Sequence, residues 1–219
     1  PGLAAPRSHV FDALVALCLG NKRKAATILG LGPKQLDLID INAELATAPT
    51  APAIEIYTGV LYDALDFSTL PAAAKKRAST RVAISSALFG LLRPGDLIPQ
   101  YRLSADTTIP GLGPLAAVWR DGVQAELRAT TGPILDVRSG AYVKLGPLPA
   151  ETADRGFVGR ILLEKAGKRN VVSHHNKATK GLLVREILGA SKAPRSADDL
   201  LDFLEDLGFR VEVHQPKKP

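Results

Sequence analysis

The residues best suited to chemistry gather in the segment SHHNKATKGLLVREIL, Ser173–Leu188. A helix is expected to begin near Asn176. At about 100° per residue, four residues fall on one sector of this helix: Lys177, Lys180, Gly181 and Arg185. The first turns of a helix carry free backbone N–H groups and the positive end of the helix dipole, which attract anions. A glycine between the lysines would let the backbone of a ligand approach closely. The pattern indicates either a phosphate-binding helix or an ordinary solvated basic face.

Two histidines, His174 and His175, precede this helix at what reads as the end of a strand. Adjacent residues of a strand point to opposite faces, so the pair cannot easily bind one metal ion. Since the sequence has a single cysteine, Cys18, and scattered acids, we predict no metal site and no cofactor. His174, near the lysines, is better suited to contact a phosphate or to shuttle a proton.

The segment ALFGLLRPGDLIPQYRL, Ala87–Leu103, places Arg93, Tyr101 and Arg102 in an apolar stretch that is stiffened by prolines. An arginine in such a setting needs a partner, because burying an unpaired charge is costly. Two alternatives follow. Either the arginines form internal pairs, such as Arg93 with Asp96, or a rigid loop offers bidentate donors to a phosphate or carboxylate.

Three more polar residues, Ser139, Tyr142 and Lys144, follow a predicted strand in the segment DVRSGAYVKL, Asp136–Leu145. Ser139 with the glycine after it could form an anion-binding turn. The tyrosine and lysine are two positions apart rather than four, and no GxGxxG follows a first strand. The sequence therefore excludes a short-chain dehydrogenase.

Near the N-terminus, ILGLGPKQLDLI, Ile28–Ile39, has the pattern of a helix-hairpin-helix. Gly30 and Gly32 would form a tight hairpin whose N–H groups, together with Lys34, can hold a DNA phosphate without reading sequence. The same glycines are also typical of a plain turn between two helices.

The net charge of the 219 residues is +6, and it is unevenly distributed. Between residues 138 and 185 the sequence has ten Lys or Arg against three acids, an excess of seven positive charges. Such a local excess favours anionic partners, including DNA, RNA, nucleotides and phosphorylated metabolites. No apolar run approaches the ~20 residues of a membrane helix, and the single cysteine excludes a disulfide framework and suits a reducing cytosol.

Helices and strands alternate irregularly along the sequence. We expect one domain, residues 1–219, of the α/β or α+β class, with a mixed β-sheet flanked by helices. Residues 1–48 form its helical lobe, with helices over 8–19 and 21–29. Short strands are expected at 54–59 and 209–214, a buried strand begins near 81, and Ser196 should cap a helix that follows it. Trp119 is expected to pack on the apolar face of its helix.

Several of these segments resemble the peroxide stress protein YaaA family, also called the UPF0246 group. The similar strings are YTGVLYDAL (57–65), SALFGLLRPGDLIPQYRL (86–103), SGAYVK (139–144) and KATKGLLVR (177–185), with Trp119 in its helix. They occur in the family's order across most of the chain. Family members begin with a short strand and a loop that this sequence lacks.

The resemblance implies a cytosolic bacterial protein that helps cells survive hydrogen peroxide and is associated with lower free iron. It also implies a mixed α/β fold with a positively charged cleft that binds DNA. The candidate cleft residues are Arg93, Tyr101, Arg102, Ser139, Tyr142, Lys144, His174, Lys177, Lys180, Gly181 and Arg185. Two alternatives stay open beside DNA binding: an enzyme for a nucleotide or other phosphorylated molecule in the same cleft, and a solvated basic face with structural arginines.

Overall fold

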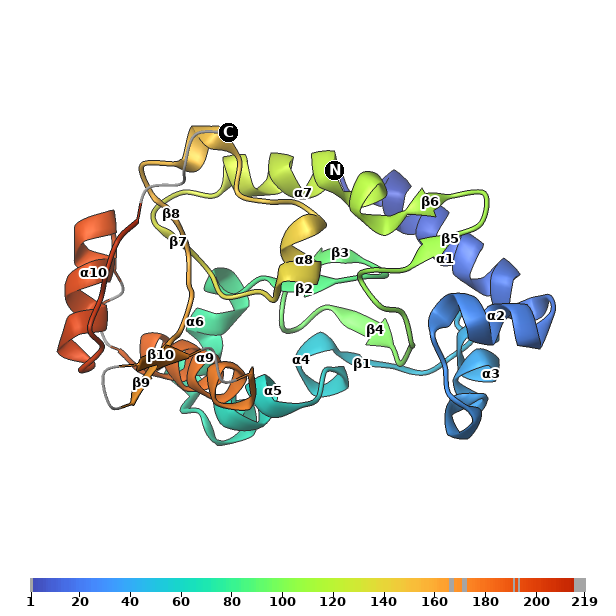
Figure 1. Ribbon diagram of the computed structural model, residues 1–219, viewed down its shortest axis with the longest axis horizontal. Helices are drawn as coiled ribbons and strands as arrows, with labels where there is room; N and C mark the ends of the chain where they lie inside the picture. The colour runs from blue at the N-terminus through green and yellow to red at the C-terminus, as the bar shows by residue number, and fades with distance from the viewer. Residues whose placement is uncertain (1, 166–167, 171–172, 191, 193, 215–219) are drawn as a thin grey trace.

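The structure is a computed structural model. It describes residues 2–165, 168–170, 173–190, 192 and 194–214. For the described residues between 163 and 175, it describes the backbone alone. Helices and short strands alternate along the chain, which confirms the expected mixed fold class. The longer helices lie mainly at the periphery in Figure 1, and several strand pairs lie between them.

The N-terminal part is helical, as expected, and consists of α1 (Ala4–Leu19), α2 (Lys22–Leu29) and α3 (Asp37–Ala43), with a 3₁₀ turn at Pro33–Gln35. The α2 helix has clear end signals. The Asn21 side chain accepts a hydrogen bond from the Lys24 N–H at 3.0 Å. At the other end Gly30 adopts a φ of 63°, a left-handed conformation that glycine adopts without strain.

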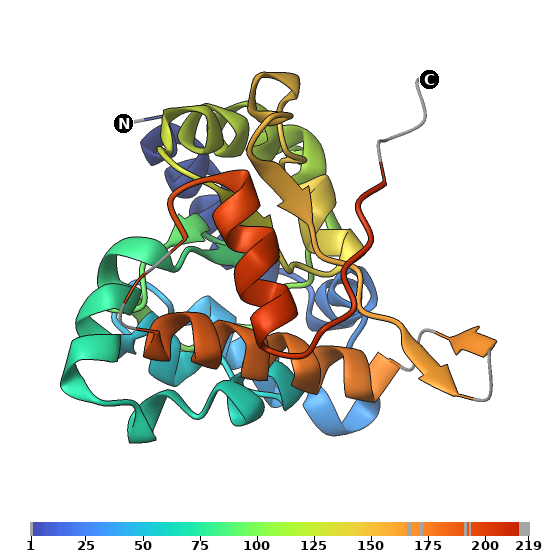
Figure 2. The same ribbon diagram turned by 90° about the vertical axis from the view of Figure 1, so that its left-hand side faces the viewer.

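The strands form five two-stranded pairings within the described residues rather than the single mixed sheet that we expected. Four pairings are antiparallel: β1 (Thr50–Pro52) with β4 (Leu97–Pro99), β2 (Ile84–Ser86) with β3 (Gly90–Leu92), β5 (Thr108–Ile109) with β6 (Gly113–Pro114), and β9 (Leu163–Lys165) with β10 (Lys168–Asn170). The parallel pairing joins β7 (Ile134–Asp136) to β8 (Gly156–Val158). Figure 2 shows β9 and β10 extending away from the rest of the chain.

Trp119 is the largest fully buried side chain and organises the main core. It lies on α7 (Leu115–Ala129), as the sequence predicted, and its Nε1–H donates to the Ala87 carbonyl at 2.9 Å. Gly90, with a φ of 77°, passes over the indole ring. A Cβ at this position would lie 2.8 Å from the ring carbons, so the close approach requires glycine.

A second apolar cluster forms where α9 (Ser173–Gly189) packs along α5 (Val60–Leu65) and touches α6 (Ala72–Arg81). Gly181 is buried at the crossing with α5. A Cβ on Gly181 would collide with the Leu61 carbonyl oxygen and would lie 2.9 Å from the Ala64 Cβ. The remaining helices are α4 (Ala53–Ile56), α8 (Gly140–Lys144) and α10 (Ala197–Asp206), beside two further 3₁₀ turns at Phe67–Thr69 and Ala150–Thr152.

Several local expectations are wrong. Residues 54–56 belong to helix α4 rather than a strand, and residues 209–214 form no strand. The α9 helix begins at Ser173, so the backbone at His174 and His175 is helical and the argument from a strand does not hold. The α10 helix is capped by Ser196 as predicted, with the Asp199 N–H donating to the Ser196 hydroxyl at 3.0 Å.

The α5–α9 crossing gives a first prediction. Gly181→Ala should lower the free energy of unfolding by about 1–3 kcal/mol or more, since overpacking outweighs the gain of about 1 kcal/mol in helix propensity. Gly189→Ala, in the same helix with open space around the new methyl group, should be neutral or slightly stabilising. Urea denaturation of both variants measures the difference, and equal stabilities would contradict the close crossing.

Candidate functional site

All four tyrosines of the sequence gather in one cluster, although they lie on different segments: Tyr57, Tyr62, Tyr101 and Tyr142. The Tyr57 and Tyr62 rings stack with centroids 5.8 Å apart, and Tyr57 meets Tyr101 edge-on at 6.3 Å. The hydroxyl of Tyr101 lies 2.8 Å from both the Tyr57 hydroxyl and the Ser86 hydroxyl. The Phe89 N–H donates to Ser86 Oγ at 3.0 Å, which anchors this chain of hydroxyls to the backbone.

Burial keeps these phenols protonated. Desolvation raises the pKa of Tyr101 to about 12, although hydrogen bonds from Ser86 and Tyr57 act in the opposite direction. Desolvation also raises the pKa values of Tyr57, Tyr62 and Tyr142. The nearby Arg102 charge partly offsets the shift at Tyr142, whereas Asp106 adds to it. At neutral pH the cluster therefore consists of hydrogen-bonding hydroxyl groups and not of phenolates.

A buried ion pair lies beneath Tyr142. The Arg138 guanidinium donates two hydrogen bonds to the Asp136 carboxylate, from Nε to Oδ1 at 2.9 Å and from Nη2 to Oδ2 at 2.6 Å. Both side chains are largely buried, with 14% and 3% of their surfaces exposed. The guanidinium also donates to the carbonyls of Tyr142 at 3.4 Å and Gly146 at 2.9 Å. The pair thus fixes helix α8 against strand β7.

Lys180 joins this group from α9. Its half-buried amine donates to the Arg138 carbonyl at 3.4 Å. Desolvation lowers the pKa of Lys180, and the Asp136 charge opposes that shift only in part. The structure therefore brings together Tyr101 and Tyr142, which the sequence selected from separate segments, and connects Lys180 to them only through Arg138.

Three further predicted residues are exposed: Arg102, Lys144 and Lys177. Arg102 follows Tyr101 and lies near Tyr142, Lys144 ends α8, and Lys177 precedes Lys180 by about one helical turn. The backbone of Arg102 is held by two hydrogen bonds of 2.8 Å to the Asn42 side chain. Within the described residues, the side chains of these three residues have no hydrogen bond or ion pair. Ser139 is exposed at the start of α8, and its hydroxyl makes no capping bond.

Two arginines that were predicted to bind an anion instead make hydrogen bonds within the fold. The Arg93 Nη1 donates to the carbonyls of Thr80 and Val82, where α6 ends, at 3.2 and 3.1 Å. Arg185 donates to the carbonyls of Leu65 and Asp66, both at 2.8 Å, where α5 ends. Both guanidinium groups therefore satisfy carbonyls that a helix end leaves without partners.

Gly181 was expected to let the backbone of a ligand approach closely. This expectation is wrong, because helix α5 fills the space above Gly181 and leaves no room for a ligand backbone. The side chain of His174 lies outside the described residues.

In the segment predicted as a hairpin, a 3₁₀ turn joins α2 to α3, and the N–H groups of the turn have internal acceptors. The Gly30 N–H donates to the Thr27 carbonyl at 3.3 Å, the Leu31 N–H to the Ala26 carbonyl at 2.9 Å, and the Gly32 N–H to the Gln35 side chain at 3.2 Å. Lys34 is exposed. Of the groups proposed to hold a phosphate, the Lys34 side chain is thus the one that remains open to solvent.

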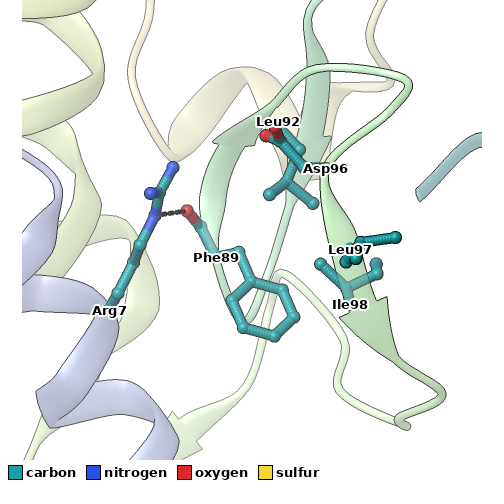
Figure 3. A pocket seen from close by; sticks show the side chains of 6 residues that line it. All are labelled: Arg7, Phe89, Leu92, Asp96, Leu97 and Ile98. Carbon is teal, nitrogen blue, oxygen red and sulfur yellow. Dashed lines mark hydrogen bonds between the residues drawn. The ribbon is translucent and has the colours of Figure 1, made fainter. Parts of the chain in front are cut away.

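A cavity of about 320 Å³ lies elsewhere, between α1 and strand β4. Figure 3 shows Arg7 reaching from α1 to the Phe89 carbonyl, at 2.8 Å, with Leu97 and Ile98 on the far side. Arg7 also donates to the Leu91 carbonyl at 2.6 Å. Because its guanidinium is bound to backbone, this cavity offers an anion little.

Two searches of the described residues bear on the remaining expectations. No group of three or more His, Cys, Asp or Glu side chains that could hold a metal ion occurs among them. Across the same part of the chain, no helix has both the length and the apolar character needed to cross a membrane.

Comparison with known proteins identifies the family. A family model described as "Peroxide stress protein YaaA" matches residues 2–215. The chain belongs to this family. It is 46% identical to a UPF0246 protein of Streptomyces coelicolor over 220 residues, which cover 100% of the chain and 84% of that relative. A UPF0246 protein of Corynebacterium efficiens is 37% identical over 222 residues, which cover 100% of the chain and 86% of that relative. A UPF0246 protein of a Ruegeria species is 31% identical over 173 residues, which cover 75% of the chain and 68% of that relative.

The structure of this YaaA family member adds site residues that were not selected from the sequence: Tyr57, Tyr62, Asp136 and Arg138. A signal for the tyrosines was available. The sequence has only four tyrosines, and all of them fall in strings that resemble the family. No comparable local signal marked Asp136 and Arg138, because an acid and an arginine two residues apart are common on a protein surface.

The tyrosine cluster of this YaaA-family protein predicts an alkaline transition. The ordinary tyrosine pKa is about 10, so above that pH the unfolded chain releases protons that the folded cluster retains. Stability should be fully present below pH 10 and should fall above it, by at most about 1.4 kcal/mol per pH unit for each tyrosine. Absorbance at 295 nm, recorded with circular dichroism, should show phenolates appearing together with unfolding. Four tyrosines that titrate near pH 10 in the native protein would contradict the buried cluster.

Proposed function

We propose that this protein acts in the cytosolic peroxide stress response by binding duplex DNA, and that this binding helps to limit iron-driven oxidative damage to DNA. The contact surface would consist of Arg102, Lys144, Lys177 and Lys180, which we call the basic surface. Family membership supports the stress role. The observation that supports DNA binding is that, in the described residues, none of these four cations forms an ion pair with a carboxylate, and three of them are exposed.

The arrangement of the basic surface suits a polyanion. Arg138 links Lys180 to α8 through its carbonyl, and Tyr142 on α8 lies near Arg102. Four cations on neighbouring elements can contact several phosphates, and such contacts position a duplex without reading its sequence. Arg138 and Arg185 bind internal groups, but they keep their charges and so add to the local field.

The N-terminal hairpin has a smaller part in this proposal. Its N–H groups at Gly30 and Gly32 are used within the fold, so we assign it at most a contact through Lys34.

The proposal predicts strong salt dependence. Four phosphate contacts give a slope of log K against log[salt] of about −3 to −4, so affinity should fall roughly 100-fold between 50 and 200 mM salt. The double variant Lys144→Ala, Lys177→Ala should reduce the magnitude of that slope by about 2. Fluorescence anisotropy with a labelled duplex measures both values.

Two controls separate the basic surface from total charge and from stability. Lys76→Ala removes an exposed lysine from α6 and should leave the slope unchanged. Arg93→Ala should lower the melting temperature without changing the slope, because its guanidinium caps α6. Affinity that hardly varies with salt, or a Lys76 variant that weakens binding as much as the double variant, would overturn the proposal.

A phosphorylated small molecule, such as a nucleotide, is the second candidate ligand. The observation that favours it is the half-buried amine of Lys180 at the Arg138 carbonyl, because partial burial strengthens a charge-assisted contact with phosphate. Acid–base chemistry by a tyrosine would make such a site enzymatic.

A thermal-shift screen tests this candidate. A nucleotide at about 100 times its dissociation constant should stabilise the protein by about 2.7 kcal/mol, which raises the melting temperature by roughly 5–10 °C. The unphosphorylated nucleoside should have little effect, and Lys180→Met should remove the response. A panel of nucleotides that produces no shift at millimolar concentration argues against this candidate.

A further inference from the structure

Lys180 differs from Lys144 and Lys177, the other lysines of the basic surface, because it is half-buried and gains no carboxylate partner among the described residues. Nζ has one hydrogen-bond acceptor among the described residues, the Arg138 carbonyl at 3.4 Å. The nearest acid, Asp136, has both carboxylate oxygens engaged by Arg138, at 2.9 and 2.6 Å. Lys144 and Lys177 are exposed by comparison.

This environment favours the neutral amine. Desolvation lowers the pKa of Lys180, and a larger neutral fraction at physiological pH makes a lysine a better nucleophile towards carbonyl groups. A fully solvated ammonium group keeps its charge at every physiological pH, so partial burial is what distinguishes Lys180 as a nucleophile from the exposed lysines.

Aldehydes occur in DNA where a base has been lost, because the ring-opened form of the remaining deoxyribose carries an aldehyde at C1′. A backbone held by Arg102, Lys144 and Lys177 would keep such a sugar beside the fourth cationic position. We propose that Lys180 forms an imine with the aldehyde of a base-free deoxyribose in DNA. This inference rests on the DNA binding proposed above, and it defines one lesion as the preferred target.

The reaction is balanced without an oxidant or reductant. The Lys180 nitrogen adds its lone pair to C1′, an N–C bond forms, and the aldehyde oxygen leaves as water with the two protons of the amine.

Borohydride trapping tests the imine, since reduction converts it to a stable secondary amine. The full chain is incubated with a labelled duplex that contains one base-free site, reduced with sodium borohydride, and separated on a denaturing gel. Protease digestion and mass spectrometry then locate the modified residue. We expect a covalent complex with the modification on Lys180.

Two matched variants make the result specific. Lys180→Arg keeps the positive charge but cannot form the imine, so trapping should fall at least 10-fold, and by more than any loss of affinity for an intact duplex. Lys76→Arg, on α6 outside the basic surface, should trap as the unchanged protein does. Melting temperatures of both variants verify that the fold is retained.

The other outcomes separate this inference from the proposed function. Binding of the intact duplex without a trapped complex overturns the imine but leaves DNA binding standing. A complex that persists in Lys180→Arg, or a modification that maps to another lysine, also overturns it. If the protein neither binds the intact duplex nor forms a trapped complex, both proposals are overturned together.

Discussion

The buried ion pair between Asp136 and Arg138 is the interaction on which the candidate site depends. The Arg138 guanidinium donates to the carboxylate at the end of β7 and to the carbonyls of Tyr142 and Gly146 around α8, and the backbone carbonyl of Arg138 accepts a hydrogen bond from the amine of Lys180. Removal of either partner would leave a charge buried without compensation, which typically costs about 3–5 kcal/mol. The value of the pair therefore lies in geometry: it connects a strand, a short helix and the α9 helix at one point.

The arginines divide into two groups by what their guanidinium groups bind. Arg93 and Arg185 complete the C-terminal ends of α6 and α5, and Arg7 binds the carbonyls of Phe89 and Leu91. Arg102, in contrast, is held through its backbone, by Asn42, and its guanidinium has no hydrogen bond or ion pair within the described residues. A guanidinium on a carbonyl keeps its charge, so in the proposed function the first group would add to the positive field and the exposed cations would contact the anion.

Features set by neighbouring residues were predictable from the sequence. The caps at Asn21 and Ser196 and the left-handed Gly30 depend on contacts within a few positions, so the helices α2 and α10 were expected where they lie. Long-range features were not predictable. The Arg185 contact spans 120 positions to Leu65, and Gly181 is a glycine because α5 crosses there. The segment at residues 54–59 has β-branched and aromatic residues typical of a strand, yet Ala53–Ile56 is helical, with hydrogen bonds from the N–H groups of Ala53 and Ile54 to the 94–96 loop.

The side chains available for chemistry in these 219 residues also fit a protein that works in the presence of peroxide. The sequence contains no methionine and one cysteine, and these are the side chains that peroxide oxidises most readily. Cys18 is buried on α1, and desolvation raises the pKa of its thiol, which keeps it from the reactive thiolate form. The candidate site has an amine and a set of protonated phenols among its described side chains, and hydrogen peroxide oxidises neither group as readily as it oxidises a thiol or a thioether.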